Sequence, residues 1–331
     1  MEGALDVVVA VRGLFEHRQD AAVAEKPSDN VFQWQDVYDA DPHGSPLLIQ
    51  TDLVPEKPGT DVTFLGESYR PDDGRTNWRC GLKLGPIDKT LQVTGPRRWE
   101  AKQTSVTRRM AWEIGSVDSA DSVPVDWRLT AGGPLIGPEG PDATTIDPRN
   151  PIGLGRPDAD APDTAEYRAP QILRVDETEP CQPAGLGPLA PFWQDRSQYA
   201  GTYDEAWKAN RHPLLPRDFD SRFWQCAPPD QIATPHLRGD ETYCLRNLHW
   251  EVPEAKGVLP GIDLAVLHED SGIADWHVLA LDGVQFDWRS DAMVALTWRV
   301  RFPLPKAQTA KLTLQRVRLV PQSEVPEEEV A

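Results

Sequence analysis

Apolar and polar residues alternate with a period of two along several stretches of the chain, which is the pattern of β-strands with one buried face. In the longest stretch, apolar side chains recur at every second residue from Val294 to Phe302. The alternating stretches are residues 78–84, 91–93, 110–114, 262–266, 276–281 and 294–302. The first three predict successive antiparallel strands. The whole set predicts a mainly β fold, with antiparallel sheets packed face to face as a β-sandwich-like core.

A last strand is predicted to begin at Leu312 and Leu314. Val317 and Leu319 fall out of phase with these two leucines. A β-bulge near Gln315 would absorb the extra residue.

Residues 132–238 have a different character, because Pro or Gly recurs every few residues and the alternation is weak. We expect irregular structure there. The segment carries more aromatic side chains than a flexible linker would use. They are Phe192, Trp193, Tyr199, Tyr203, Trp207, Phe219, Phe223 and Trp224. We therefore expect the segment to pack onto the sheets.

One or two short helices are expected within this irregular segment, and the capping residues of one can be identified. Thr202 and Glu205 are spaced as a capping box, in which Thr202 is the N-cap and Glu205 reaches back to its amide. Pro213 would end this helix.

The predicted organisation is a single domain over residues 5–320. Its parts are N-terminal strands (5–131), the irregular segment (132–238) and C-terminal strands (239–320). Residues 321–331 contain four Glu and little to bury, and we expect them to form an acidic, frayed tail.

The chain has 331 residues, with 34 Lys and Arg against 52 Asp and Glu, which gives a formal net charge of −18. This balance argues against nucleic-acid binding, because neutralising phosphates requires a surplus of basic side chains. Twelve Trp, eight Phe and six Tyr argue against disorder. The 32 Pro favour loops, turns and extended segments over helices.

The N-terminal sequence does not resemble a signal peptide, because its apolar run is short, contains Asp6 and follows no basic stretch. No window approaches the roughly 18 uninterrupted apolar residues of a membrane helix. We therefore expect a soluble, cytoplasmic protein without membrane insertion.

The four cysteines, Cys80, Cys181, Cys226 and Cys244, lie far apart and form no C-x-x-C pair. Reduced and mostly buried thiols are the expected state. The seven His fall into no metal-binding spacing, so we expect neither a metal nor another cofactor.

Asp218 and Asp220, in P-R-D-F-D, are the closest approach of the sequence to a catalytic pair. Glycoside hydrolysis needs two carboxyl groups at a defined separation with different pKa values, and calcium needs about six to eight oxygen ligands. The simpler interpretation is that both residues cap turns and pair with Arg217 or Arg222. No Ser or Cys lies in a nucleophile motif, so we expect a protein that is not an enzyme.

Several sequence blocks resemble one family. They are K-P-G-T-D-V (57–62), L-Q-V-T-G-P-R-R-W (91–99), N-P-I-G-L-G (150–155), the block 193–207, the block 211–231, and R-G-D-E (238–241). The match is densest over residues 193–241. From about residue 7 to residue 319 the chain resembles the bacterial family called domain of unknown function 2169, whose members are encoded beside type VI secretion components.

This resemblance implies an effector adaptor or chaperone. Such a protein holds a toxic effector in the producing cell and helps to load it onto the spike made by the VgrG and PAAR proteins. An adaptor needs surface complementarity and no catalytic group, so we interpret the matched residues as structure-defining and expect effector contacts on less marked loops. The matched residues are Asp61, Arg97, Trp99, Asn150, Pro151, Gly153, Trp193, Arg196, Gly201, Thr202, Tyr203, Asp204, Trp207, Pro213, Pro216, Asp218, Phe219, Asp220, Ala227 and Pro228.

The chain departs from the family pattern at one place. Where the family has a Tyr-Glu pair before an aromatic residue and Gly-Gly, this chain has Trp127 and Arg128, followed by Ala131, Gly132 and Gly133. If the family's Glu contacts the partner, Arg128 implies a different effector. If that Glu forms an internal salt bridge, a compensating change lies elsewhere in the chain.

Two alternative functions stay open at this point. The Trp content and the Asp residues around Asp218 are compatible with a carbohydrate-binding or carbohydrate-cleaving β-sandwich protein. A purely structural component of the secretion machine would have the same sequence features as an adaptor.

Overall fold

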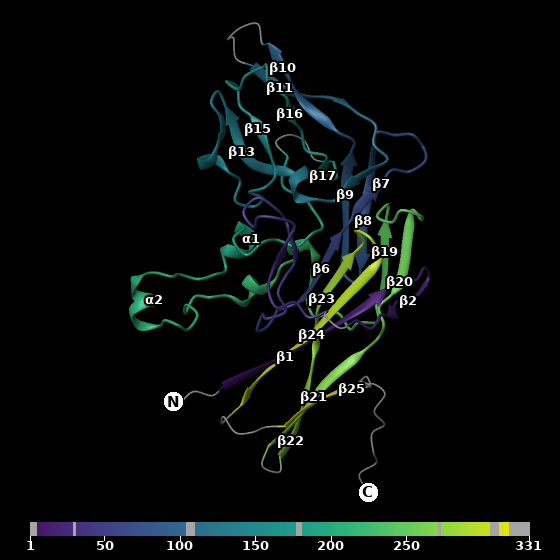
Figure 1. Ribbon diagram of the computed structural model, residues 1–331, viewed down its shortest axis with the longest axis vertical. Coiled ribbons are helices and arrows are strands. Elements are labelled where there is room, and N and C mark those ends of the chain that lie inside the picture. The colour runs from purple at the N-terminus through teal and green to yellow at the C-terminus, as the bar shows by residue number, and fades with distance from the viewer. Residues whose placement is uncertain are drawn as a thin grey trace.

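The computed structural model describes residues 5–28, 31–103, 110–176, 181–270, 273–304 and 311–317. The fold is mainly β (Figure 1). One six-stranded sheet, here called the first sheet, joins strands from both ends of the chain. In spatial order its strands are β18 (Ile232–Ala233), β6 (Thr60–Leu65), β23 (Ala280–Asp287), β24 (Met293–Leu304), β1 (Leu5–Glu16) and β3 (Ala24–Glu25).

The long strands β1 and β24 pair antiparallel along their whole length, from Leu5 opposite Leu304 to Glu16 opposite Met293. β24 contains the longest alternating stretch of the sequence, and its apolar residues Val294, Leu296 and Trp298 are buried as expected. β6 and β23 pair in parallel within the same sheet.

A second six-stranded sheet packs against the first. Its strands, in spatial order, are β17 (Ile172–Arg174), β9 (Ile87–Thr94), β8 (Asn77–Leu84), β19 (Thr242–Arg246), β20 (Glu254–Val258) and β2 (Ala21–Ala22). β8 and β9 form the antiparallel pair that the sequence predicts.

The main core lies between these two sheets. Val62, Phe64 and Leu296 of the first sheet and Trp78 and Leu91 of the second belong to one cluster of buried apolar residues. Removing a large apolar side chain from water stabilises the fold by roughly 1.5–3 kcal/mol per residue. The predicted β-sandwich-like core is therefore confirmed, and its sheets are antiparallel except for the parallel pairs β6–β23 and β2–β20.

Five smaller sheets extend or flank this core. They are β11 (Met110–Val117), β10 (Arg97–Gln103) and β16 (Tyr167–Arg168); β14 (Gly140–Asp142), β13 (Ala131–Gly137) and β15 (Leu154–Pro157); β12 (Ser122–Pro124) and β7 (Glu67–Tyr69); β22 (Ile273–Val278), β21 (Asp263–Asp270) and β25 (Lys311–Val317); and β4 (Val37–Tyr38) with β5 (Leu47–Ile49). In Figure 1 the sheets containing β10 and β13 lie at the top, and the sheet containing β21 lies at the bottom.

Three details of the strand prediction are wrong. The stretches 91–93 and 110–114 are not neighbouring strands, because β9 lies in the second sheet and β11 in a small separate one. The stretch 276–281 is divided at Leu279, between β22 and β23. No bulge occurs near Gln315, because β25 pairs with β21 in continuous register from Lys311 to Val317. Leu319 lies outside the described residues.

The segment 132–238 is only partly irregular. It contains two short α-helices, α1 (Gln194–Ser197) and α2 (Glu205–Asn210), as the sequence predicts. Short 3-10 helices lie at Ala143–Thr145, Ser221–Trp224 and Pro229–Gln231, and another precedes the segment at Trp127–Leu129. The strands β13 to β18 were not predicted, because most of them are two to four residues long and too short for a legible alternation.

No disulfide joins any two of the four cysteines, all of which lie in the described ranges, and Cys80 and Cys226 are buried as expected. No helix among the described residues is long and apolar enough to cross a membrane. The predicted acidic tail, residues 321–331, lies outside the described ranges.

Candidate functional site

The loop at residues 150–155, which matches the family pattern, fixes the conformation of the turn at Gly132 and Gly133. The Asn150 side-chain amide donates to the main-chain oxygen of Ala131 at 2.9 Å. Gly132 and Gly133 have φ values of +139° and +63°. A Cβ on Gly132 would lie 2.3 Å from the main-chain oxygen of Asn150, and a Cβ on Gly133 would lie 2.3 Å from the main-chain oxygen of Gly153. Only glycine fits this close approach of two backbones, so Asn150, Gly153 and the intervening Pro151 belong to a structural lock.

Arg128, the residue that departs from the family pattern, is held by two carboxylates. Its guanidinium donates to Asp126 at 2.6 Å and contacts Asp39 at 2.9 Å. Asp126 also caps the short 3-10 helix by accepting from the Arg128 amide. Within this chain, Arg128 therefore belongs to a surface ion-pair network, and Asp39 supplies a partner of the opposite charge.

Asp61 joins two of the matched blocks. Its buried carboxylate accepts from the Lys57 ammonium at 2.7 Å and from the Gln225 side chain at 2.8 Å. It also accepts from the main-chain amides of Cys226 at 2.8 Å and Ala227 at 3.2 Å. The segment 225–227 is therefore bound to β6 by charge-assisted hydrogen bonds in addition to apolar packing.

Arg97 and Trp99 stabilise the small sheet of β11, β10 and β16. The Arg97 guanidinium donates to the Pro170 oxygen at 2.5 Å. Trp99 is buried in a small cluster with Tyr167 and Ala169. Both matched residues therefore have structural roles on β10.

Trp193 and Arg196 anchor α1 to the body of the molecule. Trp193 is buried in a second cluster with Leu47 and Leu189. The buried Arg196 guanidinium donates to the Leu189 oxygen at 2.8 Å and to the Phe223 oxygen at 3.0 Å, and it lies over the Phe223 ring. Burial lowers the pKa of Arg196 below its ordinary value.

Two loop segments of the chain meet just after α1, and residues that match the family pattern join them. The Asp218 carboxylate accepts from the Thr202 amide at 3.1 Å and from the Thr202 hydroxyl at 2.7 Å. Gly201 has a φ of +78°, and a Cβ there would lie 2.9 Å from the buried Pro216. These contacts bring residues 199–202 against residues 216–220, and we call this junction the root.

Asp220 completes the root. Its amide donates to the Tyr199 oxygen at 3.0 Å. Its carboxylate caps the following 3-10 helix and pairs with Arg222 at 2.6 Å, and the Arg222 guanidinium lies over the Tyr199 ring. The predicted pairing of Asp220 with Arg222 is confirmed, whereas Asp218 binds Thr202 and not an arginine.

The carboxylates of the root do not form an acid–base pair. Hydrogen bonds from Thr202 lower the pKa of Asp218, and hydrogen bonds from Arg222 lower the pKa of Asp220. Both groups are therefore ionised at neutral pH. A glycosidase of the usual kind needs one carboxyl group with a raised pKa, and neither aspartate supplies it.

Residues 203–215, here called the arm, extend from the root away from the sheets, with α2 at the far left of Figure 1. The N-cap of α2 is Asp204, which accepts from the Trp207 amide at 2.7 Å. The predicted capping box at Thr202 is wrong, because the Thr202 hydroxyl is bonded to Asp218 instead. α2 ends at Asn210, before Pro213, as expected.

The arm is held in shape by contacts of its own. The Trp207 indole donates to the Leu214 oxygen at 2.8 Å, and its ring lies against those of Tyr203 and His212. The Arg211 guanidinium donates to the Leu215 oxygen at 2.7 Å. No residue of α2 is buried, and none of the described core clusters includes an arm residue.

Apolar side chains are exposed on this projection. Tyr203 is 52% exposed, Leu214 60% and Leu215 42%. The expectation that the aromatic residues of this segment pack onto the sheets is correct for Trp193 but wrong for Tyr203, and Trp207 packs within the arm. The sequence signal that could have indicated the arm is the Leu-Leu pair between Pro213 and Pro216.

The chain matches, over residues 2–299, a family model described as "uncharacterized protein conserved in bacteria (DUF2169)". The chain belongs to this bacterial family. Comparisons with curated proteins and with solved structures gave no match.

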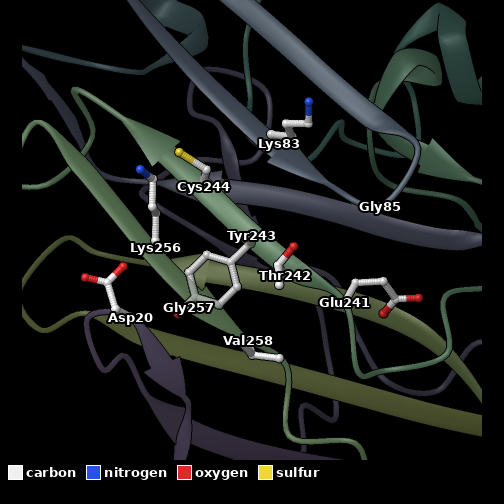
Figure 2. A pocket seen from close by; sticks show the side chains of 10 residues that line it. All are labelled: Asp20, Lys83, Gly85, Glu241, Thr242, Tyr243, Cys244, Lys256, Gly257 and Val258. Atoms are coloured by element: carbon white, nitrogen blue, oxygen red, sulfur yellow. The ribbon is translucent and has the colours of Figure 1, made fainter.

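A groove on the outer face of the second sheet is a second candidate site of this DUF2169 protein. Its cavity has a volume of about 620 Å³ (Figure 2). Lys83, Cys244 and Lys256 lie side by side on three adjacent strands. Lys83 pairs with Asp88 at 3.2 Å, and Lys256 pairs with Glu254 at 2.7 Å. Both ammonium groups of the groove therefore already have carboxylate partners.

The groove of the DUF2169 protein offers little for catalysis. Burial raises the pKa of the Cys244 thiol, which disfavours the nucleophilic thiolate. Asp20 and Glu241 lie at its rim, and the Tyr243 ring is 2% exposed. Among the residues that the structure describes, no three His, Cys, Asp or Glu side chains are grouped to hold a metal ion.

Proposed function

We propose that this DUF2169 protein is a non-catalytic adaptor that binds a type VI secretion effector in the cytoplasm of the producing bacterium. In this proposal it helps to load the effector onto the spike of VgrG and PAAR proteins. The observation that carries the proposal is the arm, a projection with a defined shape and exposed apolar side chains. The arm lies within the densest matched stretch, residues 193–241, so this proposal replaces the expectation that effector contacts lie on less marked loops.

Exposed apolar side chains on a projection favour contact with another protein. Contiguous apolar surface on soluble proteins commonly marks an interaction site, and Tyr and Trp are frequent at the centres of interfaces. Tyr203, Leu214 and Leu215 lie outside the core clusters described above, so burial within this chain does not account for their apolar character.

The fixed shape of the arm also favours binding. A segment that is ordered before it meets its partner loses less conformational entropy on association. The hydrogen bonds of Trp207 and Arg211 within the arm, and of Asp218 and Asp220 at the root, supply this order.

The chemistry of the candidate groups is consistent with an adaptor. The two root aspartates are ionised and engaged in hydrogen bonds. Burial raises the pKa of the Cys80 and Cys226 thiols to about 12, so both are protonated at neutral pH.

Co-purification tests this proposal. The full chain carrying a tag is expressed with the proteins encoded beside it, and the proteins that remain bound are identified by mass spectrometry. We expect a toxin or a PAAR-bearing protein in stoichiometric amount. Recovery of the folded, monodisperse chain alone would contradict the adaptor function, and a glycan screen would then test the carbohydrate-binding alternative.

A further inference from the structure

The strand β1 has a long edge with no strand beside it. On one side β1 pairs with β24 along its whole length, from Leu5 to Glu16, without a shift in register (Figure 1). On the other side β3 pairs only with Phe15 and Glu16. Within the described ranges, no other strand lies beside residues 5–13 on that side, and we call this side of β1 the free edge.

The free edge differs from the other margins of the two large sheets. Their terminal strands, β18, β3, β17 and β2, are only two or three residues long. Loops cover the neighbouring strands further along. On β6, the Phe64 amide donates to the Leu186 oxygen at 2.9 Å. On β20, the Lys256 oxygen accepts from the Asp20 amide at 2.8 Å.

The sequence of the free edge, L-D-V-V-V-A-V-R-G, lacks the usual protection against strand addition. Soluble proteins protect long edges with Lys, Pro or a bulge, because an unpaired edge is a template for another strand. Residues 5–13 contain neither Lys nor Pro, and their continuous register excludes a bulge. Four Val favour strand pairing, and Val8 is 39% exposed. We therefore expect another strand to cover this edge.

Every second residue of the free edge presents its main-chain N–H and C=O groups outward. The Leu14 oxygen accepts from the Lys26 amide at 2.8 Å, so Leu14 faces the side of β3. Main-chain groups alternate in direction along an antiparallel strand, so Asp6, Val8, Ala10 and Arg12 face the same side. Their outward groups form no main-chain hydrogen bond to any residue of the described ranges. They are therefore available to an added strand.

Two copies of the free edge fit each other in antiparallel orientation. Val9 is the middle residue of this edge, so placing it opposite Val9 of a second copy uses the whole edge. Each outward-facing residue then lies opposite an outward-facing residue of the other copy, as Val8 does opposite Ala10. Four such pairs form about eight main-chain hydrogen bonds. A two-fold axis at Val9 relates the copies, which is the commonest symmetry of protein oligomers.

The charges of the free edge also match in this register. Asp6 lies opposite Arg12 of the second copy, and opposite charges on facing residues stabilise an antiparallel pair, whereas like charges destabilise it. Within its own chain Asp6 pairs with Arg301, and Arg12 pairs with Asp52. These ion pairs need not break, because the match depends only on the signs of the facing charges. A slip of two residues in either direction loses the match and shortens the pairing.

The C-terminal residues of the same chain are a poorer occupant of the free edge. Residues 318–331 contain two Pro, which cannot donate to a strand ladder, and four Glu. The free edge itself has the composition that a partner strand needs. Val9 and Val11 are only partly buried against the main core, and Val7 of a second copy would pack beside Val11.

We propose that β1 forms the interface of a symmetric dimer. The free edges of two copies pair antiparallel about Val9 and join the two first sheets into one continuous sheet. This inference does not depend on the adaptor function, and its test requires no effector.

Sedimentation velocity of the full chain over a concentration series tests the dimer. We expect the wild type to be a reversible dimer. Val8→Pro removes one outward N–H from each copy and leaves the pairing with β24 intact. The dissociation constant should rise by at least about tenfold, because the dimer loses two hydrogen bonds. Val8→Ala keeps the N–H and is the matched control, with an expected change of less than about threefold. Circular dichroism verifies that both variants are folded.

Cysteine cross-linking tests the register without altering Val8. Val9→Cys places two thiols opposite each other across the axis, at a separation that suits a disulfide. Mild oxidation should give a covalent dimer of this variant. Val7→Cys lies on the same face but opposite Val11, so it should give no more covalent dimer than the wild type with its four native cysteines.

Three results would overturn the proposal. The first is a monomeric wild type, including one whose Val8 and Ala10 amides are protected from hydrogen exchange, since another segment of the chain would then cover the edge. The second is an equal effect of Val8→Pro and Val8→Ala on the dissociation constant. The third is a dimer that Val9→Cys does not cross-link above the wild-type level, which would show that the copies associate through another surface.

Discussion

Asp61 illustrates, at the scale of one residue, how a buried carboxylate can join segments that are far apart in the sequence. It accepts hydrogen bonds from Lys57, Gln225, Cys226 and Ala227. The Lys57 side chain is also buried, so each charge depends on the other for compensation.

Asp61→Asn should therefore destabilise the fold strongly. Removing one charge from a buried pair leaves the other without compensation and costs about 3–5 kcal/mol. Urea denaturation at neutral pH measures the loss in the free energy of unfolding. Asp73→Asn breaks the exposed pair with Arg75 and is the control, with an expected change within about 0.5 kcal/mol. Similar effects of the two substitutions would contradict this account of Asp61.

The pH dependence of the root follows from Asp218. Hydrogen bonds to Thr202 lower its pKa in the folded state, so the ionised form stabilises the root. This contribution is fully present above the unfolded pKa of about 3.9 and is lost as the pH falls through the lower folded value. Hydrogen exchange of the Thr202 amide, corrected for intrinsic rates, should show constant protection from pH 7 to pH 5 and a loss below about pH 3.9. A loss of protection already between pH 7 and pH 5 would show that another group controls the root.

At the scale of elements, the arm is an ordered segment without a core. Its shape depends on hydrogen bonds around Trp207 and on the root, and no core cluster described above includes it. The arm should therefore loosen without global unfolding when one of these bonds is removed.

Trp207→Phe tests this independence. The substitution removes the indole N–H that donates to Leu214, a bond worth about 1 kcal/mol. We expect faster proteolysis within residues 203–215 and an unchanged midpoint of global unfolding. Trp34→Phe, at a side chain that is 72% exposed, is the control and should leave the arm's proteolysis rate unchanged. If the midpoint of global unfolding falls together with the protease resistance of the arm, the arm unfolds cooperatively with the core and this account is wrong.

The sequence predicts elements well where one face of a strand is buried over many residues. The alternation at Trp78–Leu84 and Val294–Phe302 identified β8 and β24 because their buried faces belong to the main core. The bulge predicted at Gln315 is absent, because Leu312 and Leu314 are both about half exposed and β25 has no buried face that would fix the phase of its alternation.

The candidate sites were less predictable for a similar physical reason. The matched residues at the root were identified from the sequence, but the outward direction of the arm depends on contacts between residues 199–202 and 216–220. Thr202 and Asp204 are both good N-caps, and the contact of Thr202 with Asp218 decides between them.

At the scale of the whole molecule, the net charge of −18 should affect association. A strongly acidic adaptor attracts a basic effector over distances of about a Debye length, roughly 10 Å at 0.1 M salt. We expect the association rate to fall as ionic strength rises, with a smaller change in the dissociation rate. Stopped-flow measurements over a salt series check this, and rates indifferent to salt would exclude electrostatic steering.

A quantitative pull-down with arm variants tests most directly whether the arm binds the proposed effector. The double substitution Leu214→Ser and Leu215→Ser removes exposed apolar surface from the arm, while Leu312→Ser and Leu314→Ser remove a similar amount from β25. We expect the arm variant to lose at least about tenfold in effector affinity, as for residues central to an interface. The β25 variant should bind like the wild type. Full binding by the arm variant would contradict the claim.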